Sequence, residues 1–216
     1  MSSVRATEIL KWVKGPKVLD VGCTSHEVEV DSPHWLHGRL LEKFPYVVGI
    51  DISSQNIESL RKAGFTNLYV QSAESFELTD KFDTIVAGEL IEHLANPGLF
   101  LQRAKSHLNQ QGSIVLTTPN PFSIAYALYA FLKYPKTCQN LEHTCWFCPG
   151  TMVELARRHG LKVSHFKLIE DYDSEKFPFF YGQFSRIMKL LKPVLPGRLR
   201  KTMLFVLVAN DDAVAT

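Results

Sequence analysis

The sequence predicts an α/β fold: a doubly wound, mostly parallel seven-stranded sheet with an antiparallel edge strand and a small helical cap. Short runs rich in valine and isoleucine alternate with helix-like segments, which is the pattern of parallel strands joined by crossover helices. After residue 160 this alternation stops, and two strand-like runs follow with about thirty residues of other character between them. We expect this late pair to add an antiparallel edge.

Each expected strand is a short apolar run rich in β-branched residues, and turn-forming residues flank most of these runs. A length of 216 residues fits one ordinary domain, and we expect one domain over residues 1–216. The expected strands span residues 17–21, 46–50, 67–71, 83–87, 113–118, 161–169 and 203–209.

The expected helices are placed by apolar residues at helical spacing and by their end signals. Serine, asparagine or cysteine stands where a capping residue belongs, proline falls in several first turns, and glycine follows several last turns. The expected helices span residues 3–14, a segment starting at Ser32 and Pro33, residues 53–64, residues 96–112 and a segment starting at Cys148 and Pro149.

Composition excludes several classes of protein. The 216 residues are 45% hydrophobic and 21% charged, which is typical of a globular chain rather than a disordered or membrane-embedded one. A formal charge of +2 gives no electrostatic reason to expect nucleic acid as a partner. The N-terminus does not resemble a signal peptide, and the longest apolar run, residues 203–209, is too short to span a bilayer. We therefore expect a soluble, cytoplasmic protein.

The cysteines raise the question of a zinc site. Cys138, Cys145 and Cys148 lie close together in the sequence, with His143 between them. A single CxxC pair is a weak signal, however, and His143 and Cys145 are too close in sequence to join one tetrahedral site easily. Cys148 is also explained as a helix cap. We therefore expect no metal site, and a zinc-binding module stays as an alternative.

Two acidic residues lie where a sheet of this kind binds ligands, at the carboxyl ends of its strands. Asp20 and Gly22 end the first strand, and Asp51 ends the second. A carboxylate at the second position suits a ribose, because its two oxygens accept hydrogen bonds from both vicinal hydroxyls. The alternative for Asp51 is a helix-terminus residue favoured by the helix dipole.

Several segments together resemble the class I S-adenosylmethionine-dependent methyltransferases over residues 17–165. VLDVGC is similar to the first motif of that family, VVGIDIS to its ribose-binding strand end, and FDTIVAGELIEHL to its fourth-strand motif. The helix NPGLFLQRAKSHLNQQG, the strand SIVLTTPNP and the segment EHTCWFCPGTMVELARRHGL follow in the family's order. FDTIVAGELIEHL and TTPNP are most similar to the branch of ubiquinone-type and small-molecule O-methyltransferases.

The resemblance implies which residues contact S-adenosylmethionine. The first loop would face the methionine end, Asp51 the ribose and Ile52 the adenine, while Gly88 and Glu89 would lie beside the sulfonium. The family often has aspartate where Ser72 stands, so a hydroxyl replaces a carboxylate there. The implied cofactor-binding residues are Asp20, Gly22, Cys23, Asp51, Ile52, Ser72, Ala73, Gly88 and Glu89.

Methyl transfer to an oxygen requires that the acceptor lose a proton, and a neutral histidine accepts protons near pH 7. His93 lies just beyond the sulfonium segment with Glu92, and His143 begins the later motif. We expect His93 and His143 to be catalytic, the alternative being that they only shape the pocket. His34 and His37 lie three residues apart, and we expect them on a solvent or core-edge face of a helix.

The first loop departs from the family pattern. It has a single glycine, Gly22, and the β-branched Thr24 disfavours positive φ. Asp51 also follows the loop at a greater distance than the roughly twenty positions typical of dinucleotide-binding folds. We expect Gly22 alone to allow close approach of the backbone, and residues 23–31, with Glu27, Glu29 and Asp31, to detour around the methionine end.

Two segments outside the common sheet are candidates for the cap and the acceptor site, residues 120–140 and 171–201. The first is aromatic, and residues 182–201 contain six Lys or Arg and no acid. That composition suits an acceptor with a phosphate or carboxylate, or a transient membrane-surface contact, while a solvated basic face is the alternative. The sequence makes no prediction of the oligomeric state.

We therefore expect a methyltransferase that O-methylates a small molecule such as a sugar, lipid precursor or secondary metabolite. Three alternatives stay open. A methyltransferase-like protein that binds S-adenosylmethionine without turnover would follow from the altered loop. A nicotinamide-dependent oxidoreductase would use the same sheet, although the single loop glycine disfavours it. The zinc-binding module is the third.

Overall fold

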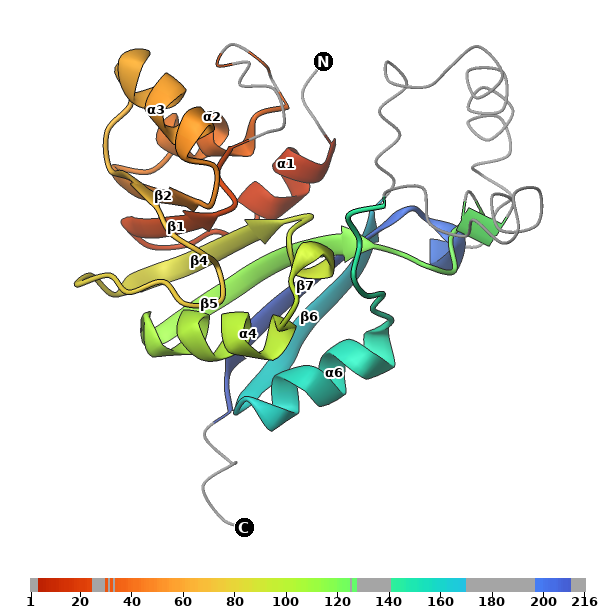
Figure 1. Cartoon of the computed structure of the whole chain (residues 1–216). Coiled ribbons are helices and arrows are strands. Elements are labelled where there is room, and N and C mark those ends of the chain that lie inside the picture. Colours follow the sequence, from red (N-terminus) through yellow and green to blue (C-terminus); the bar gives the residue numbers. More distant parts are fainter. Residues whose placement is uncertain are drawn as a thin grey trace, which may run out of the picture.

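Seven strands in the described part of the chain form one sheet, in the order β3-β2-β1-β4-β5-β7-β6 (Figure 1). The structure is a computed structural model that describes residues 4–24, 30, 32, 34–124, 126–127, 141–169 and 197–210. The strands are β1 Lys17–Val21, β2 Tyr46–Asp51, β3 Leu68–Val70, β4 Phe82–Gly88, β5 Leu108–Pro119, β6 Leu161–Ile169 and β7 Thr202–Ala209. The helices are α1 Val4–Leu10, α2 Leu36–Leu41, α3 Ser54–Lys62, η1 Ile91–His93, α4 Pro97–Ser106, α6 Pro149–Arg158 and η2 Gly197–Leu199.

The sheet is parallel from β3 to β5 and antiparallel at its far edge. β1 pairs in parallel with both β2 and β4, and β4 pairs in parallel with β5. β7 runs antiparallel between β5 and β6, so the last two of the described strands form this side of the sheet. The predicted fold class is confirmed. The predicted cap segments, 120–140 and 171–201, lie largely outside the described residues.

Helices cover both faces of the sheet, which explains why its central strands are apolar on both sides. Successive residues point to opposite faces: Val18 packs with α1 and α2, while Leu19 packs in the cluster that contains α4 and α6. Figure 1 shows α1 and α2 on one side of the sheet and α4 and α6 on the other. Phe205 of β7 is fully buried in the larger cluster.

Local end signals set the bounds of two helices, as predicted. The Ser53 hydroxyl accepts a hydrogen bond from the Asn56 amide at the start of α3, and Gly64 follows the helix with φ +94°. Cys148 caps α6 in a reciprocal arrangement with Thr151, and Pro149 occupies the first turn.

The helix predicted over residues 96–112 is shorter in the structure. α4 ends at Ser106, and β5 begins at Leu108, which pairs with Phe82 of β4. The register then shifts between Phe82 and Thr84, and a side chain at Gly112 would lie 2.9 Å from the Phe82 carbonyl oxygen. This long-range strand pairing, absent from the local pattern, ends the helix early.

The first two helices are also shorter than predicted. α1 ends at Leu10, and the Trp12 amide bonds to the Ile9 carbonyl oxygen in a turn. α2 begins at Leu36, because Ser32 and Trp35 form a turn in which the Trp35 amide bonds to the Ser32 carbonyl oxygen. Among the helices described, none has the length and apolar composition needed to cross a bilayer.

Candidate cofactor and acceptor site

The candidate site lies where the strand order reverses. β1 lies beside β4 in the sheet, while the chain proceeds from β1 to β2 and β3 on one side and from β4 to β5 on the other. Crevices at such points, outside the carboxyl ends of the strands, bind ligands in open α/β sheets. The residues after β1, β2 and β4 therefore define the site.

The loop after β1 turns at Gly22, which has φ +78°. The Gly22 and Cys23 amides both donate to the Ile50 carbonyl oxygen, at 2.9 and 3.1 Å, which fixes the turn against β2. A side chain at Gly22 would meet the Leu90 side chain at 3.1 Å. Thr24 avoids positive φ. Gly22 is thus the position in this turn that needs glycine.

The Asp51 carboxylate, at the end of β2, accepts hydrogen bonds from two backbone amides. Its Oδ1 accepts a hydrogen bond from the Ser53 amide at 2.9 Å, and its Oδ2 accepts one from the Thr24 amide at 3.1 Å. Each carboxylate oxygen keeps a further lone pair for a ligand hydroxyl. The neighbouring Ile52 is 77% exposed, so a large apolar side chain faces outward beside a polar anchor. The remainder of the loop, with Glu27, Glu29 and Asp31, lies outside the described residues.

Asp20 has a partner that the sequence analysis missed. Its Oδ2 lies 3.1 Å from His37 Nδ1, and both side chains are buried. His37 was expected on a solvent or core-edge face, and that prediction is wrong. Gly49 in β2 makes room for the ring, because a side chain there would lie 2.7 Å from His37 Cε1. The sequence feature that could have indicated this contact is Gly49 itself, because a glycine inside a valine-rich strand leaves room for a neighbouring side chain.

Cys23 follows Gly22, and the turn after β3 follows the strand beside β2. The Cys23 side chain is buried, and burial, followed by the charges of Asp20 and Asp51, raises the pKa of its thiol. Its carbonyl oxygen accepts a hydrogen bond from the Trp35 indole at 2.9 Å. In the turn after β3, the Ser72 hydroxyl accepts a 3.3 Å hydrogen bond from the Glu74 amide, and Ala73 is buried.

The chain bends sharply after β4. Glu89 has φ +53°, a conformation that is uncommon for residues other than glycine and that concentrates at functional sites. Its amide donates to the Thr117 carbonyl oxygen at 3.0 Å, which ties the bend to the end of β5. Gly88 precedes it, and a side chain there would meet Leu36 at 3.1 Å.

Immediately beyond the bend, η1 brings Glu92 and His93 together with the distant His143. One ligand atom from each of the three residues lies within 4.8 Å of the others. The two imidazole rings meet edge to face, with their centroids 4.7 Å apart. Thr144 holds the two segments together: its amide donates to the Glu92 carbonyl oxygen at 2.8 Å, and its hydroxyl to the Leu94 carbonyl oxygen at 2.6 Å.

This cluster is electrostatically unusual. Glu92 is 1% exposed, and burial, followed by the negative charge of Glu89, raises the pKa of its carboxyl to about 8. Burial and the neighbouring His93 lower the pKa of His143, while Glu142 acts in the opposite direction. Shifted pKa values in a crevice are typical of functional sites.

Of the cysteines considered for zinc, Cys145 and Cys148 lie in the described residues, and neither is among the ligand atoms of this cluster. Cys145 Sγ contacts the carbonyl oxygens of Ile91 and Glu92 at 3.8 and 3.9 Å, and burial raises the pKa of its thiol. Cys148 caps α6. Cys138 lies outside the described residues.

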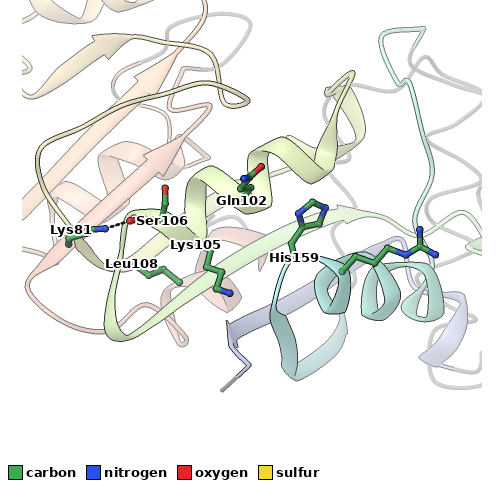
Figure 2. A pocket seen from close by; sticks show the side chains of 7 residues that line it. Lys81, Gln102, Lys105, Ser106, Leu108 and His159 are labelled. Carbon is green, nitrogen blue, oxygen red and sulfur yellow. Dashed lines mark hydrogen bonds between the residues drawn. The ribbon is translucent and has the colours of Figure 1, made fainter. Parts of the chain in front are cut away.

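A separate hollow of about 680 Å³ lies at the opposite ends of the strands, their amino ends (Figure 2). It is lined by residues near the amino ends of β4 and β5 and the last turns of α4 and α6, among them Lys81, Lys105, Arg158 and His159. Figure 2 shows the Lys81 amine directed at the Ser106 carbonyl oxygen. Because it lies at the amino ends of the strands, this hollow is separate from the candidate site at Gly22, Asp51 and Glu89.

Comparisons with known proteins agree with the geometry. A family model described as a methyltransferase domain matches residues 6–165. A ubiquinone biosynthesis O-methyltransferase of Nitrobacter winogradskyi is 30% identical over 175 residues, which are 74% of this chain and 62% of that protein. A second relative of the same description, from Azorhizobium caulinodans, is covered over 46% of its length. The chain thus spans about half to three fifths of these relatives.

Solved structures show the same fold. A SAM-dependent methyltransferase of Archaeoglobus fulgidus has a TM-score of 0.64 at 18% identity, with 94% of this chain and 90% of that chain covered. The O-methyltransferase of a Brevibacillus brevis trans-AT PKS multienzyme, in complex with S-adenosyl-L-homocysteine, has a TM-score of 0.58 at 19% identity, with 95% and 72% covered. At these identities the likeness concerns the fold.

Proposed function

The chain belongs to the family of class I S-adenosylmethionine-dependent methyltransferases, and from this premise we propose that it transfers a methyl group to an oxygen of a small-molecule acceptor. The family membership confirms the resemblance found in the sequence. One observation carries the proposal: the Gly22 turn, the Asp51 carboxylate and the strained Glu89 bend converge at the carboxyl ends of adjacent strands.

The residues at this edge fit S-adenosylmethionine. Gly22 turns the chain at positive φ, so its backbone, without a side chain, allows close approach of the methionine end. The lone pairs of Asp51 that are not used by backbone amides accept the ribose hydroxyls. Ile52 offers an exposed apolar surface to the adenine. When bound, the cofactor supplies an electrophilic methyl group on sulfur.

The first loop binds the cofactor in a rebuilt form. Asp20 is held by His37, which fixes the carboxylate in the floor of the site. Cys23 contributes its backbone while its side chain packs inward, and Ser72 and Ala73 form the rim beside the adenine edge. Gly88 and Glu89 line the place of the reacting methyl group. Displacement at this methyl group depends mainly on alignment of donor and acceptor.

The acceptor loses its proton beside His93 and His143. Both rings lie just past Glu89, where an acceptor would meet the methyl group. The lowered pKa of His143 keeps this imidazole neutral at physiological pH, the form that accepts protons.

The oxygen acceptor and its small size are supported by the relatives, which are named ubiquinone biosynthesis O-methyltransferases. Sugars, lipid precursors and secondary metabolites are the classes to test. A transient membrane-surface contact through residues 182–201 would suit a lipid precursor, because this segment carries six Lys or Arg among apolar residues. Most of that segment lies outside the described residues.

The experiment has two parts. Calorimetry with S-adenosyl-L-homocysteine measures binding, and methyl-labelled S-adenosylmethionine with a panel of phenols, sugars and prenylated lipid precursors measures transfer. We expect binding and transfer to an oxygen. Binding without transfer to any class would favour the alternative, a methyltransferase-like binding protein without turnover. No binding would reject both.

A further inference from the structure

We propose that His37 is a positioning residue for the cofactor: by holding the Asp20 carboxylate near the end of β1, it sets the affinity of the site for the positively charged amino-acid end of S-adenosylmethionine. The inference rests on the proposed function, in which Asp20 lies in the floor of the cofactor site. Three observations carry it: the buried pair of side chains, a space in the sheet that fits the imidazole ring, and a second side chain that holds the same turn.

The first observation is the hydrogen bond between the two side chains. His37 Nδ1 lies 3.1 Å from Asp20 Oδ2, and the exposed fractions of these side chains are 0% and 2%. A carboxylate only accepts hydrogen bonds, so Nδ1 carries the proton in this contact. A buried ionised carboxylate is unfavourable unless other groups compensate it, and a single hydrogen bond does so only in part. A cation bound nearby would therefore be favoured.

The other nitrogen of the ring argues against a role in packing alone. His37 Nε2 is buried and has no hydrogen-bond partner among the described residues. A buried polar atom without a partner lowers the stability of the folded state, and an apolar side chain would avoid this loss. The presence of an imidazole is thus better explained by the bond that Nδ1 makes with Asp20.

The second observation is that β2 leaves space for the ring. Gly49 is the register partner of Asp20, and a side chain at Gly49 would lie 2.7 Å from His37 Cε1 and 2.8 Å from Cys23 Sγ. A glycine inside a strand weakens that strand and often marks the close approach of another group. The sheet thus contains the imidazole at a cost to one of its central strands, as expected if the pair serves the site.

The third observation is that Trp35, which precedes α2, holds the same turn from its other end. The Trp35 indole nitrogen donates to the Cys23 carbonyl oxygen at 2.9 Å, and the Trp35 side chain is buried. Trp35 and His37 therefore fix both ends of the segment from Asp20 to Cys23. This segment has a single glycine, Gly22, and the two side chains hold it in one conformation before any ligand binds.

The charges around the turn indicate which part of the cofactor would benefit. After burial, the negative charges of Asp20 and Asp51 raise the pKa of the Cys23 thiol, so both charges act on the turn. The amino-acid end of S-adenosylmethionine carries an ammonium group, and opposite charges attract strongly where water is scarce. Asp20, held by His37, should thus favour ligands with this ammonium group over adenosine thioethers that lack it.

The test compares two ligands by calorimetry on the full chain. S-adenosyl-L-homocysteine has the amino-acid end, whereas methylthioadenosine lacks it. His37→Leu should weaken binding of S-adenosyl-L-homocysteine by about 10- to 100-fold and leave the affinity for methylthioadenosine unchanged. The matched control is His107→Leu. His107 is also buried, and its Nε2 accepts a hydrogen bond from the Leu78 amide near the amino ends of the strands, so both affinities should stay as in the wild type.

Two conservative variants show whether the bond to Asp20 is responsible. The amide of His37→Asn takes the place of Nδ1 and should restore most of the affinity for S-adenosyl-L-homocysteine. The amide of His37→Gln takes the place of Nε2 and should not. This comparison remains decisive if His37→Leu does not fold, and thermal denaturation of each variant without ligand shows which variants fold.

The outcomes separate this inference from the proposed function. If His37→Leu weakens the binding of both ligands equally, or if the Asn and Gln variants bind S-adenosyl-L-homocysteine equally well, the ring only supports the fold and the inference is overturned. A wild-type protein that binds the two ligands with the same affinity would also overturn it, while leaving a nucleoside site in place. A wild-type protein that binds neither ligand would reject the proposed function as well.

Discussion

Replacing Gly22 with alanine tests whether the turn after β1 serves the cofactor or only the fold. Gly22 has φ +78°, a conformation that costs a residue with a side chain about 1–2 kcal/mol. The added methyl group would also meet Leu90 Cδ1 at 3.1 Å, a contact that a small shift of this flexible side chain relieves. The free energy of unfolding should therefore fall by about 1–2 kcal/mol, which in a chain of this size lowers the melting temperature by about 2–8 °C.

The matched control is Gly64→Ala. Gly64 has φ +94°, and nothing lies within 4 Å of the position its side chain would take. This variant carries the conformational cost without a steric one, and it lies at the end of α3, outside the candidate site. Thermal denaturation of both variants without ligand should give similar losses of stability.

The two variants should differ in ligand binding. Calorimetry with S-adenosyl-L-homocysteine should show a loss of affinity of about tenfold or more for Gly22→Ala, which corresponds to about 1.4 kcal/mol, and wild-type affinity for Gly64→Ala. If Gly22→Ala loses stability but binds the ligand as tightly as Gly64→Ala does, the turn is structural and the reasoning about close approach is refuted.

Other expectations follow from the same structure. Asp51→Asn should weaken S-adenosyl-L-homocysteine binding by about 10- to 100-fold in calorimetry, because charge-assisted hydrogen bonds to the ribose are lost. The control Asp80→Asn, near the amino ends of the strands, should leave binding unchanged. Equal effects of the two variants would contradict the ribose assignment. Hydrogen bonding at the start of α6 lowers the pKa of Cys148, so the thiolate of Cys148 persists to lower pH, whereas burial raises the pKa of Cys23. Mass spectrometry should therefore show that iodoacetamide labels Cys148 before Cys23 at every pH from about 6 to 9. Faster labelling of Cys23 would show that its thiol is not buried. Phe205→Ala should cost about 3–5 kcal/mol in urea denaturation, and a loss below 1 kcal/mol would show that this part of the core is poorly packed.

Local signals in the sequence sufficed for most of the fold. β1 and β6 have the bounds that were predicted, because each is an apolar run between turn-forming residues. The caps at Ser53 and Cys148 were also predicted, since a capping side chain bonds to amides only three residues away. α4 was predicted too long, because it ends where Leu108 pairs with Phe82, a contact between distant segments.

The candidate site was harder to predict for the same physical reason. Gly22 follows β1 directly and Asp51 is the last residue of β2, so the positions of the strands alone place both at the carboxyl ends of the strands. The pairing of Asp20 with His37 depends on where α2 begins and on the space left by Gly49, which no short motif encodes.

The cluster of Glu92 with His143 depends on contacts between segments about fifty residues apart. The hydrogen bonds of Thr144 to Glu92 and Leu94 join these segments, so the local sequence around the histidines identified candidates for proton transfer but not the nearby Glu92 carboxylate.

The most direct test of the central claim is a crystal structure of the chain with S-adenosyl-L-homocysteine. We predict the ligand at the carboxyl ends of β1, β2 and β4, with the ribose hydroxyls on Asp51, the backbone of Gly22 against the homocysteine portion, and the sulfur beside Glu89. A ligand bound in the hollow between Lys81 and His159 would contradict this prediction. So would a structure obtained at saturating ligand concentration in which no ligand lies at the carboxyl ends of these strands.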